Sequence, residues 1–141
     1  MEKDMIKEVV EIKEGNFVLA RHIPAAAAWN DGLNFFSQEN DFIQVGMWGY
    51  SAGKELKAHI HNELKREVQW TQEVLYVRKG RLRAYIFDTT EKKVAELEVN
   101  SGDIIILLFG GHGYEILENG TQVLEIKNGP YAGPDKDRRR L

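Results

Sequence analysis

The sequence predicts an all-β fold, a sandwich or a barrel, from three observations. Short segments rich in β-branched and aromatic residues recur along the chain. Turn sequences that contain glycine separate these segments at short intervals. No long stretch has the apolar periodicity of a helix. Many short strands joined by tight turns are typical of all-β sandwiches and barrels.

The composition indicates one soluble domain. The chain has 141 residues, which is enough for one hydrophobic core, and its hydrophobic fraction of 43% and charged fraction of 29% are ordinary for a globular protein. A net charge of −3 gives no reason to expect a nucleic-acid partner. Because there is no cysteine, thiolate metal sites, disulfides and cysteine nucleophiles are excluded.

No targeting or membrane segment is evident. The start, residues 1–4, is charged and leads into no apolar signal region. The longest aliphatic run, residues 104–108, is far too short to cross a bilayer. We therefore expect a cytoplasmic protein without a membrane partner.

The N-terminal third has a mixed pattern. Residues 5–13 fit either a strand or a helical turn, whereas residues 16–23 predict a strand that ends before a proline. Four alanines within 24–29 favour a helical turn, and residues 30–32 form a turn signal. Residues 41–50 are β-like, with glycines that suggest bulges.

The central stretch carries the first functional signal. His59 and His61 are two residues apart, so on a strand both imidazoles point to the same side. Glu73 opens a strongly β-favouring run that ends at Gly80. A carboxylate buried at that position needs a partner or a metal. Imidazole and carboxylate groups are common ligands of divalent transition metals, so a metal site is the first hypothesis.

Five further strands are expected, at residues 82–87, 94–99, 104–109, 114–117 and 121–127. The third of these is the most apolar, which predicts burial on both faces. The last two are expected to form a hairpin, because Asn119-Gly120 is a favoured tight-turn sequence. Beyond Pro130 the chain is polar, and residues 138–140 are expected to be a solvated tail.

Two motifs give the chain a resemblance to the cupin superfamily over residues 42–127. Five residues separate Gly53 from His59, and six residues separate Glu73 from Gly80, as in the first cupin motif. The eleven residues between His61 and Glu73 exceed the usual three or four. The second motif is matched by its glycines and histidine, although Leu108 replaces its proline and the histidine comes one residue early. These matching positions are Gly102, Gly110 and His112.

The resemblance implies a single-domain jelly-roll β-barrel with its ligand pocket at the barrel mouth. Residues 42–127 would form the cupin core, 1–41 the N-terminal strands and 128–141 a polar tail. The cupin ligand set implies metal binding by His59, His61, Glu73 and His112. Iron, manganese, nickel, cobalt and zinc all suit these ligands. The family also implies dimerisation through an edge strand, so a homodimer is expected.

The resemblance leaves three classes of function open. The first is a metal-dependent enzyme on a small polar molecule such as a sugar, either an isomerase or epimerase or a dioxygenase, with Glu73, Tyr50 and Tyr76 as candidate proton-transfer groups. The second is a non-catalytic metal or small-ligand binding module. The third is a structural barrel without metal. Residues 62–68, which lengthen the motif, are expected to form an exposed loop that acts as a lid.

Overall fold

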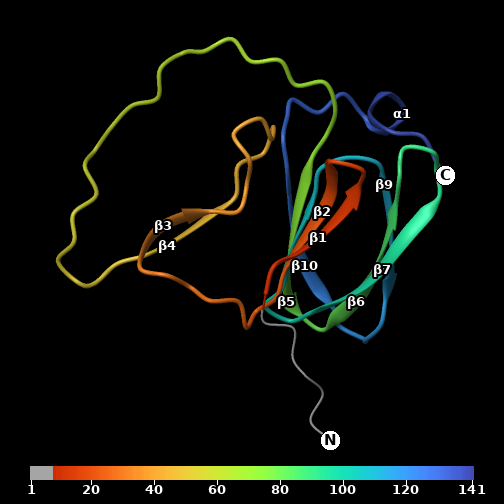
Figure 1. Cartoon of the computed structure of the whole chain (residues 1–141), viewed down its shortest axis with the longest axis horizontal. Coiled ribbons are helices and arrows are strands. Elements are labelled where there is room, and N and C mark those ends of the chain that lie inside the picture. The colour runs from red at the N-terminus through yellow and green to blue at the C-terminus, as the bar shows by residue number, and fades with distance from the viewer. Residues whose placement is uncertain (1–7) are drawn as a thin grey trace, which may run out of the picture.

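The computed structural model describes residues 8–141 and confirms the all-β prediction (Figure 1). The described part has ten strands and one short helix: β1 Val10–Glu14, β2 Phe17–Ile23, β3 Gly32–Phe35, β4 Gly46–Gly49, β5 Glu73–Lys79, β6 Arg81–Phe87, β7 Lys93–Asn100, β8 Ile104–Leu107, β9 Gly111–Ile116, β10 Gln122–Lys127 and α1 Pro134–Asp137. No helix of residues 8–141 is long and apolar enough to cross a membrane.

The strands form three antiparallel sheets, and none of them closes into a barrel among the residues described. The main sheet has the order β1-β2-β8-β5-β10, and a second sheet has the order β7-β6-β9. A separate hairpin pairs β3 with β4. From β5 onward the chain passes repeatedly between the two larger sheets, so most sheet neighbours are distant in sequence.

The two larger sheets share one core. Leu75 and Val77 from the main sheet lie in the same buried cluster as Leu82, Ala84 and Ile86 from the second sheet. Successive residues of a strand point to opposite faces, so odd-numbered residues of β5 point toward the second sheet. Whether a residue of a strand points to the inner face can therefore be read from its position in the strand. The candidate site lies on this inner face.

The outer face of the main sheet is also covered in part. Val74 and Ile106 form a second buried cluster, against which Phe36, Val45 and Met47 pack. The segment that joins β2 to β4 therefore lies over this face. As predicted, the strand at residues 104–107 is buried on both faces, because it contributes to both clusters.

Several local predictions fail. Residues 114–117 and 121–127 do not form a hairpin, because β9 pairs with β6 whereas β10 pairs with β5. Residues 24–29 contain a turn but no helix, and only Gly46–Gly49 of the predicted strand 41–50 is a strand. Residues 10–14 form a strand, while residues 5–7 of that prediction lie outside the described residues.

The C-terminal segment is attached to the body. Thr71 donates a hydrogen bond to Asp137 of α1, and Arg139 pairs with Glu91. The side chain of Leu141 lies over the backbone of Gly111 in β9. The polar tail expected from the sequence is therefore exposed but held at several points.

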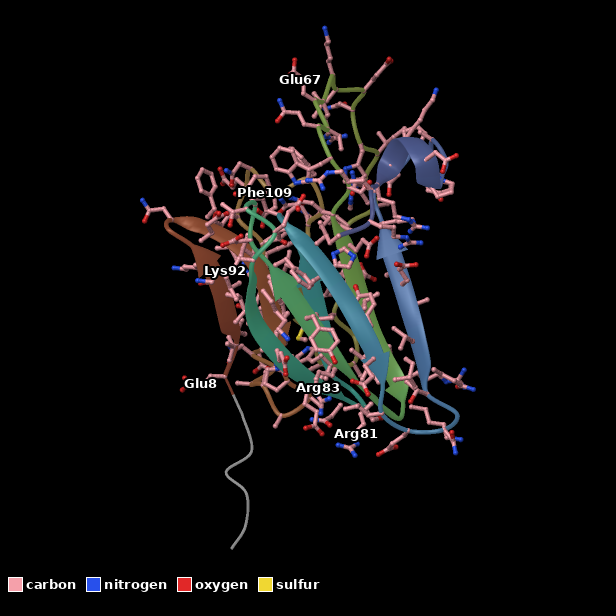
Figure 2. All side chains as sticks on the ribbon, turned by 90° about the vertical axis from the view of Figure 1, so that its right-hand side faces the viewer. Glu8, Glu67, Arg81, Arg83, Lys92 and Phe109 are labelled. Atoms are coloured by element: carbon pink, nitrogen blue, oxygen red, sulfur yellow. The ribbon has the colours of Figure 1, made fainter. Side chains whose placement is uncertain are left out.

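The connection between β4 and β5 contains no strand. Residues 50–72 are irregular, and residues 50–70 are exposed. In Figure 1 this segment makes a wide arc beside the β3–β4 hairpin, and in Figure 2 its Glu67 projects beyond the sheets. We call residues 51–69 the arm. The prediction that His59 and His61 lie on a strand is wrong for this structure, because the arm makes no ladder of hydrogen bonds.

Candidate functional site

Glu73 and His112 meet between the two larger sheets. Glu73 is the first residue of β5 and shares the inward face with Leu75. His112 lies on β9 opposite Ile86, a core residue of β6, and so also points inward. The His112 Nε2 atom is 3.2 Å from Oε2 of Glu73. Two residues almost forty positions apart are thus brought together by the packing of two sheets.

The Glu73 carboxylate is buried and incompletely satisfied. Its side chain is 9% exposed, while that of His112 is 32% exposed and reaches solvent. Among the described residues, Oε2 of Glu73 has no hydrogen-bond donor, since its approach to the imidazole lacks hydrogen-bond geometry. A buried carboxylate oxygen without a donor is unfavourable in a folded protein. The position is therefore suited to a bound cation or to a donor on a ligand.

The surrounding charges keep Glu73 ionised. Its polar contact with the His112 ring lowers the pKa of Glu73, whereas burial raises it. Lys127, its cross-strand neighbour on β10, lowers this pKa further. The net direction is downward, so the carboxylate is negative at neutral pH and attracts cations.

Tyr114 adds a polar group to the same side. It lies two residues after His112 on β9, and the two ring centroids are 5.5 Å apart. Burial and the nearby carboxylates Glu73 and Glu125 raise the pKa of the Tyr114 phenol. Its hydroxyl is therefore protonated at neutral pH and can donate a hydrogen bond to a ligand.

His59 and His61 lie elsewhere. Both are in the exposed arm, where their ring centroids are 5.0 Å apart and the His59 Nδ1 atom lies 3.2 Å from the carbonyl oxygen of Lys57. Within residues 8–141, no three histidine, aspartate or glutamate side chains gather closely enough to hold a metal ion. The predicted ligands thus lie in two separate pairs. Glu73 is close to His112, and His59 is close to His61, but the two pairs are apart.

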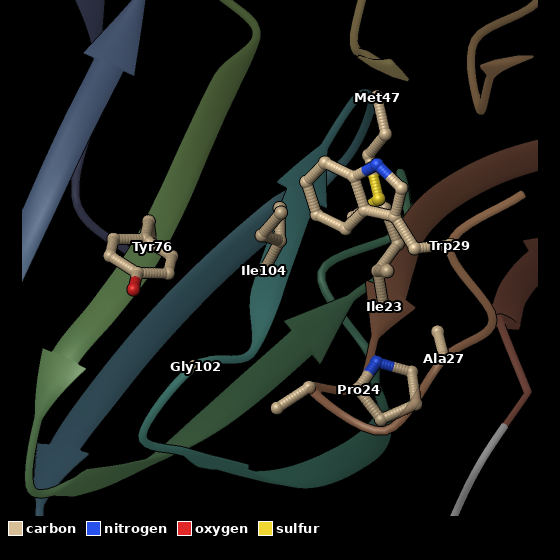
Figure 3. A pocket seen from close by; sticks show the side chains of 9 residues that line it. Ile23, Pro24, Ala27, Trp29, Met47, Tyr76, Gly102 and Ile104 are labelled. Carbon is tan, nitrogen blue, oxygen red and sulfur yellow. The ribbon is translucent and has the colours of Figure 1, made fainter. Parts of the chain in front are cut away.

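The two candidate tyrosines are also remote from Glu73. Tyr76 is on the outer face of the main sheet, where it borders a shallow cavity of about 460 Å³ with Trp29 and Met47 (Figure 3). Tyr50 follows the β3–β4 hairpin and packs against Trp48, with 5.9 Å between ring centroids. Neither tyrosine is placed to exchange a proton with a group bound at Glu73 and His112.

Gln72 has a structural position. Its Oε1 atom accepts hydrogen bonds from the backbone N–H groups of Phe42 and Ile43, at 2.8 and 3.0 Å. Its Nε2 atom donates to the carbonyl oxygen of Leu108 at 3.2 Å. With all these groups bonded to backbone, Gln72 fixes the end of the arm to the main sheet and leaves the inner face to Glu73.

Sequence reasoning missed Tyr114, Glu125 and Lys127. Tyr114 had a usable signal, because residues two apart on a strand share a face with His112. No signal in the sequence indicated Glu125 and Lys127, since their positions near Glu73 depend on the pairing of β10 with β5. Comparisons with protein-family models, with curated proteins and with solved structures found no match.

Proposed function

We propose that this protein is a cupin-like metal-binding domain that acts on a small polar molecule such as a sugar derivative. One observation carries the proposal: the buried Oε2 atom of Glu73 lacks a hydrogen-bond donor and lies 3.2 Å from the His112 imidazole nitrogen. Without a cation, the carboxylate would remain buried and partly unsatisfied.

The chemistry of this pair fits a divalent transition metal. Two ligand atoms bonded to one ion at about 2.1 Å and at right angles are separated by about 3 Å. The separation of the Glu73 and His112 atoms is close to that value. Two ligands are too few to retain such an ion, and His59 and His61 are the natural candidates to complete the set. When bound, the metal would polarise a carbonyl or hydroxyl group of the ligand.

The residues around the pair favour a polar, electron-rich ligand. The protonated Tyr114 hydroxyl can donate to a ligand oxygen, and the ammonium group of Lys127 can attract a negatively charged substituent. His112 is partly open to solvent, so a ligand can enter from that side. Hydroxyl, carbonyl and phosphate groups of sugars provide the matching chemistry. A non-catalytic metal or small-ligand binding module would use the same residues and is the second candidate.

Metal binding can be tested with cobalt(II) as the probe. We expect Glu73→Gln and His112→Ala each to weaken cobalt binding at least tenfold, because each removes one ligand. The matched control is Glu115→Gln, since Glu115 is on the same strand as His112 but its exposed carboxylate bonds to Tyr85 and Arg83. Titration calorimetry and cobalt absorption spectra measure the change. Parent-like binding by both site variants would refute the proposal.

Turnover separates the enzyme from the binding module. The parent protein should convert a sugar phosphate or nucleotide sugar when Fe(II) or Mn(II) is added, and Glu73→Gln should abolish conversion. Ligand binding without turnover across both substrate classes would support the binding module instead.

A further inference from the structure

We infer that the ligand held at Glu73 and His112 carries an apolar group beside its polar one, and that Ile116 and Val123 bind this apolar group. The inference rests on the proposed function for the position of the polar head, and it adds the chemical class of the ligand: a phosphate or similar head with a short apolar tail. Four observations support it: the open side of the sandwich, the exposed apolar side chains there, their order, and the covered end beside the site.

The sandwich is closed on one side and open on the other. On the closed side, Ile12 of β1 and Leu97 of β7 pack against the buried cluster, and Glu14 accepts a hydrogen bond from Thr89 at 2.7 Å. On the open side the edge strands are β10 and β9, which do not pair with each other within residues 8–141. In Figure 2 the ribbon of β5 is visible between them. Solvent can therefore reach the inward side chains of these two strands.

Two of these inward side chains are apolar and exposed. Ile116 pairs with Leu82 and Val123 pairs with Val77, so each shares the inward face of its sheet with a core residue. Leu82 and Val77 are 2% and 0% exposed, whereas Ile116 is 59% and Val123 is 36% exposed. Covering apolar surface of this kind with an apolar group is favourable. The two side chains thus extend the core face into a place where a ligand can contact it.

The apolar side chains follow the polar ones along the same face. On β9, Ile116 lies four residues after His112 and also points inward. On β10, Val123 lies four residues before Lys127, the cross-strand partner of Glu73. Four residues of a strand span about 13 Å. A ligand whose head is bound at Glu73 can therefore reach both apolar side chains with a tail of that length or less.

Tyr114 lies between the head and the tail of such a ligand. It is two residues from both His112 and Ile116 on the inward face of β9. Its ring offers an apolar face to the tail, and its hydroxyl group can donate a hydrogen bond to the head. Glu125 has the corresponding position on β10 and is exposed, so its carboxylate can remain in water while its methylene groups line the tail.

The C-terminal segment covers the end of the sandwich beside the site. Asn128 accepts a hydrogen bond at 2.7 Å from the backbone N–H of Gln72, and Leu141 lies over the backbone of Gly111. Each of these contacts is one residue away from a member of the candidate pair. In Figure 1, residues 128–141 run from the end of β10 over this end of the sheets to the C-terminus beside the second sheet. A ligand tail is therefore directed the other way, along β9 and β10.

Alkyl phosphates of increasing chain length test the inference by titration calorimetry. For the cobalt-loaded parent we expect hexyl phosphate to bind at least tenfold more tightly than ethyl phosphate, because each methylene group that leaves water improves binding by up to about fourfold. Ile116→Thr/Val123→Thr should reduce this ratio to less than about threefold. The matched control is Leu124→Thr/Ile126→Thr, which changes two exposed residues on the outer face of β10 and should keep the parent's ratio. Threonine preserves the strand preference, and circular dichroism verifies folding.

The outcomes separate this inference from the proposed function, because the titrations are repeated without metal. If the parent binds no cobalt but prefers hexyl phosphate, and only Ile116→Thr/Val123→Thr loses the preference, the proposed function fails and the inference stands. If the cobalt-loaded parent binds ethyl and hexyl phosphate equally, or binds neither, the inference is overturned while metal binding stands. A dimeric parent and a monomeric Ile116→Thr/Val123→Thr variant in light scattering would also overturn it, because a second copy would then cover both residues.

Discussion

At the level of single residues, the buried polar groups of this protein divide into satisfied and unsatisfied ones. Asp103 accepts hydrogen bonds from the backbone N–H groups of Ala25 and Asn100, at 2.7 and 2.9 Å. Its Oδ2 atom is also 2.8 Å from Nε2 of the buried His22. His22 is therefore structural, whereas the Oε2 atom of Glu73 has no donor among the described residues. Of these two buried carboxylates, it is Glu73 that retains an oxygen atom able to bind a cation or a donor on a ligand.

The Asp103 network should be a large contributor to stability. We expect Asp103→Ala to lower the free energy of unfolding by about 2–4 kcal/mol, because it leaves buried donors without an acceptor. Urea unfolding followed by circular dichroism measures this change. Asp135→Ala, at an exposed position in α1, should change the value by less than about 0.5 kcal/mol. Equal effects of the two substitutions would contradict the structural role of Asp103.

At the level of secondary structure, β8 is a central strand that contributes to both buried clusters. It lies between β2 and β5, with Ile105 and Leu107 in the core between the sheets and Ile106 in the cluster on the outer face. Both Ile105 and Ile106 are fully buried. A strand with apolar contacts on both faces holds the hairpin segment and the second sheet to the same scaffold.

Truncation of β8 should therefore be severe. We expect Ile106→Ala to lower the free energy of unfolding by about 2–5 kcal/mol through lost burial and a residual cavity. Val94→Ala, at a 41% exposed position on the edge strand β7, should cost less than about 1 kcal/mol. Chemical denaturation compares the two. A small loss for Ile106→Ala would mean that the outer-face cluster contributes little to folding.

At the level of the whole molecule, the arm separates the proposed ligands into two groups. Glu73 and His112 lie in the body, whereas His59 and His61 lie in the exposed arm, which forms no ladder with any strand of residues 8–141. A complete set of four ligands would therefore require the arm to change its position.

Proteolysis of the arm should depend on bound metal. The arm contains Lys54, Lys57, Lys65 and Arg66, all of them exposed. We expect trypsin to cleave there rapidly in metal-free protein and several-fold more slowly with cobalt(II), because His59 and His61 would then be held at Glu73 and His112. His59→Ala/His61→Ala should be cleaved rapidly with or without cobalt(II). A parent cleavage rate that cobalt(II) does not change would contradict the four-residue ligand set.

Local patterns were sufficient to predict most of the strands. Alternating or continuous apolar residues predicted strands at 16–23, 73–79, 82–87, 94–99 and 104–109, and the structure has a strand at each of these places, because burial on a sheet requires that pattern. The cupin resemblance predicted one site made of His59, His61, Glu73 and His112, and the structure brings only Glu73 and His112 of these together in the body. The sequence did not predict the absence of a closed barrel or the irregular arm, since both depend on which strand edges pair with another strand.

The sequence by itself determined where the chain alternates, where it turns and which side chains could bind a cation. Only packing decided which strands became neighbours: the Asn119-Gly120 turn was expected to close a hairpin, yet it connects two different sheets. Packing also placed Tyr114 and Lys127 beside Glu73, and it placed Tyr76 on the opposite face of the main sheet. The physical reason is that turn and strand preferences act over a few residues, whereas sheet partners are chosen by burial of side chains from distant parts of the chain.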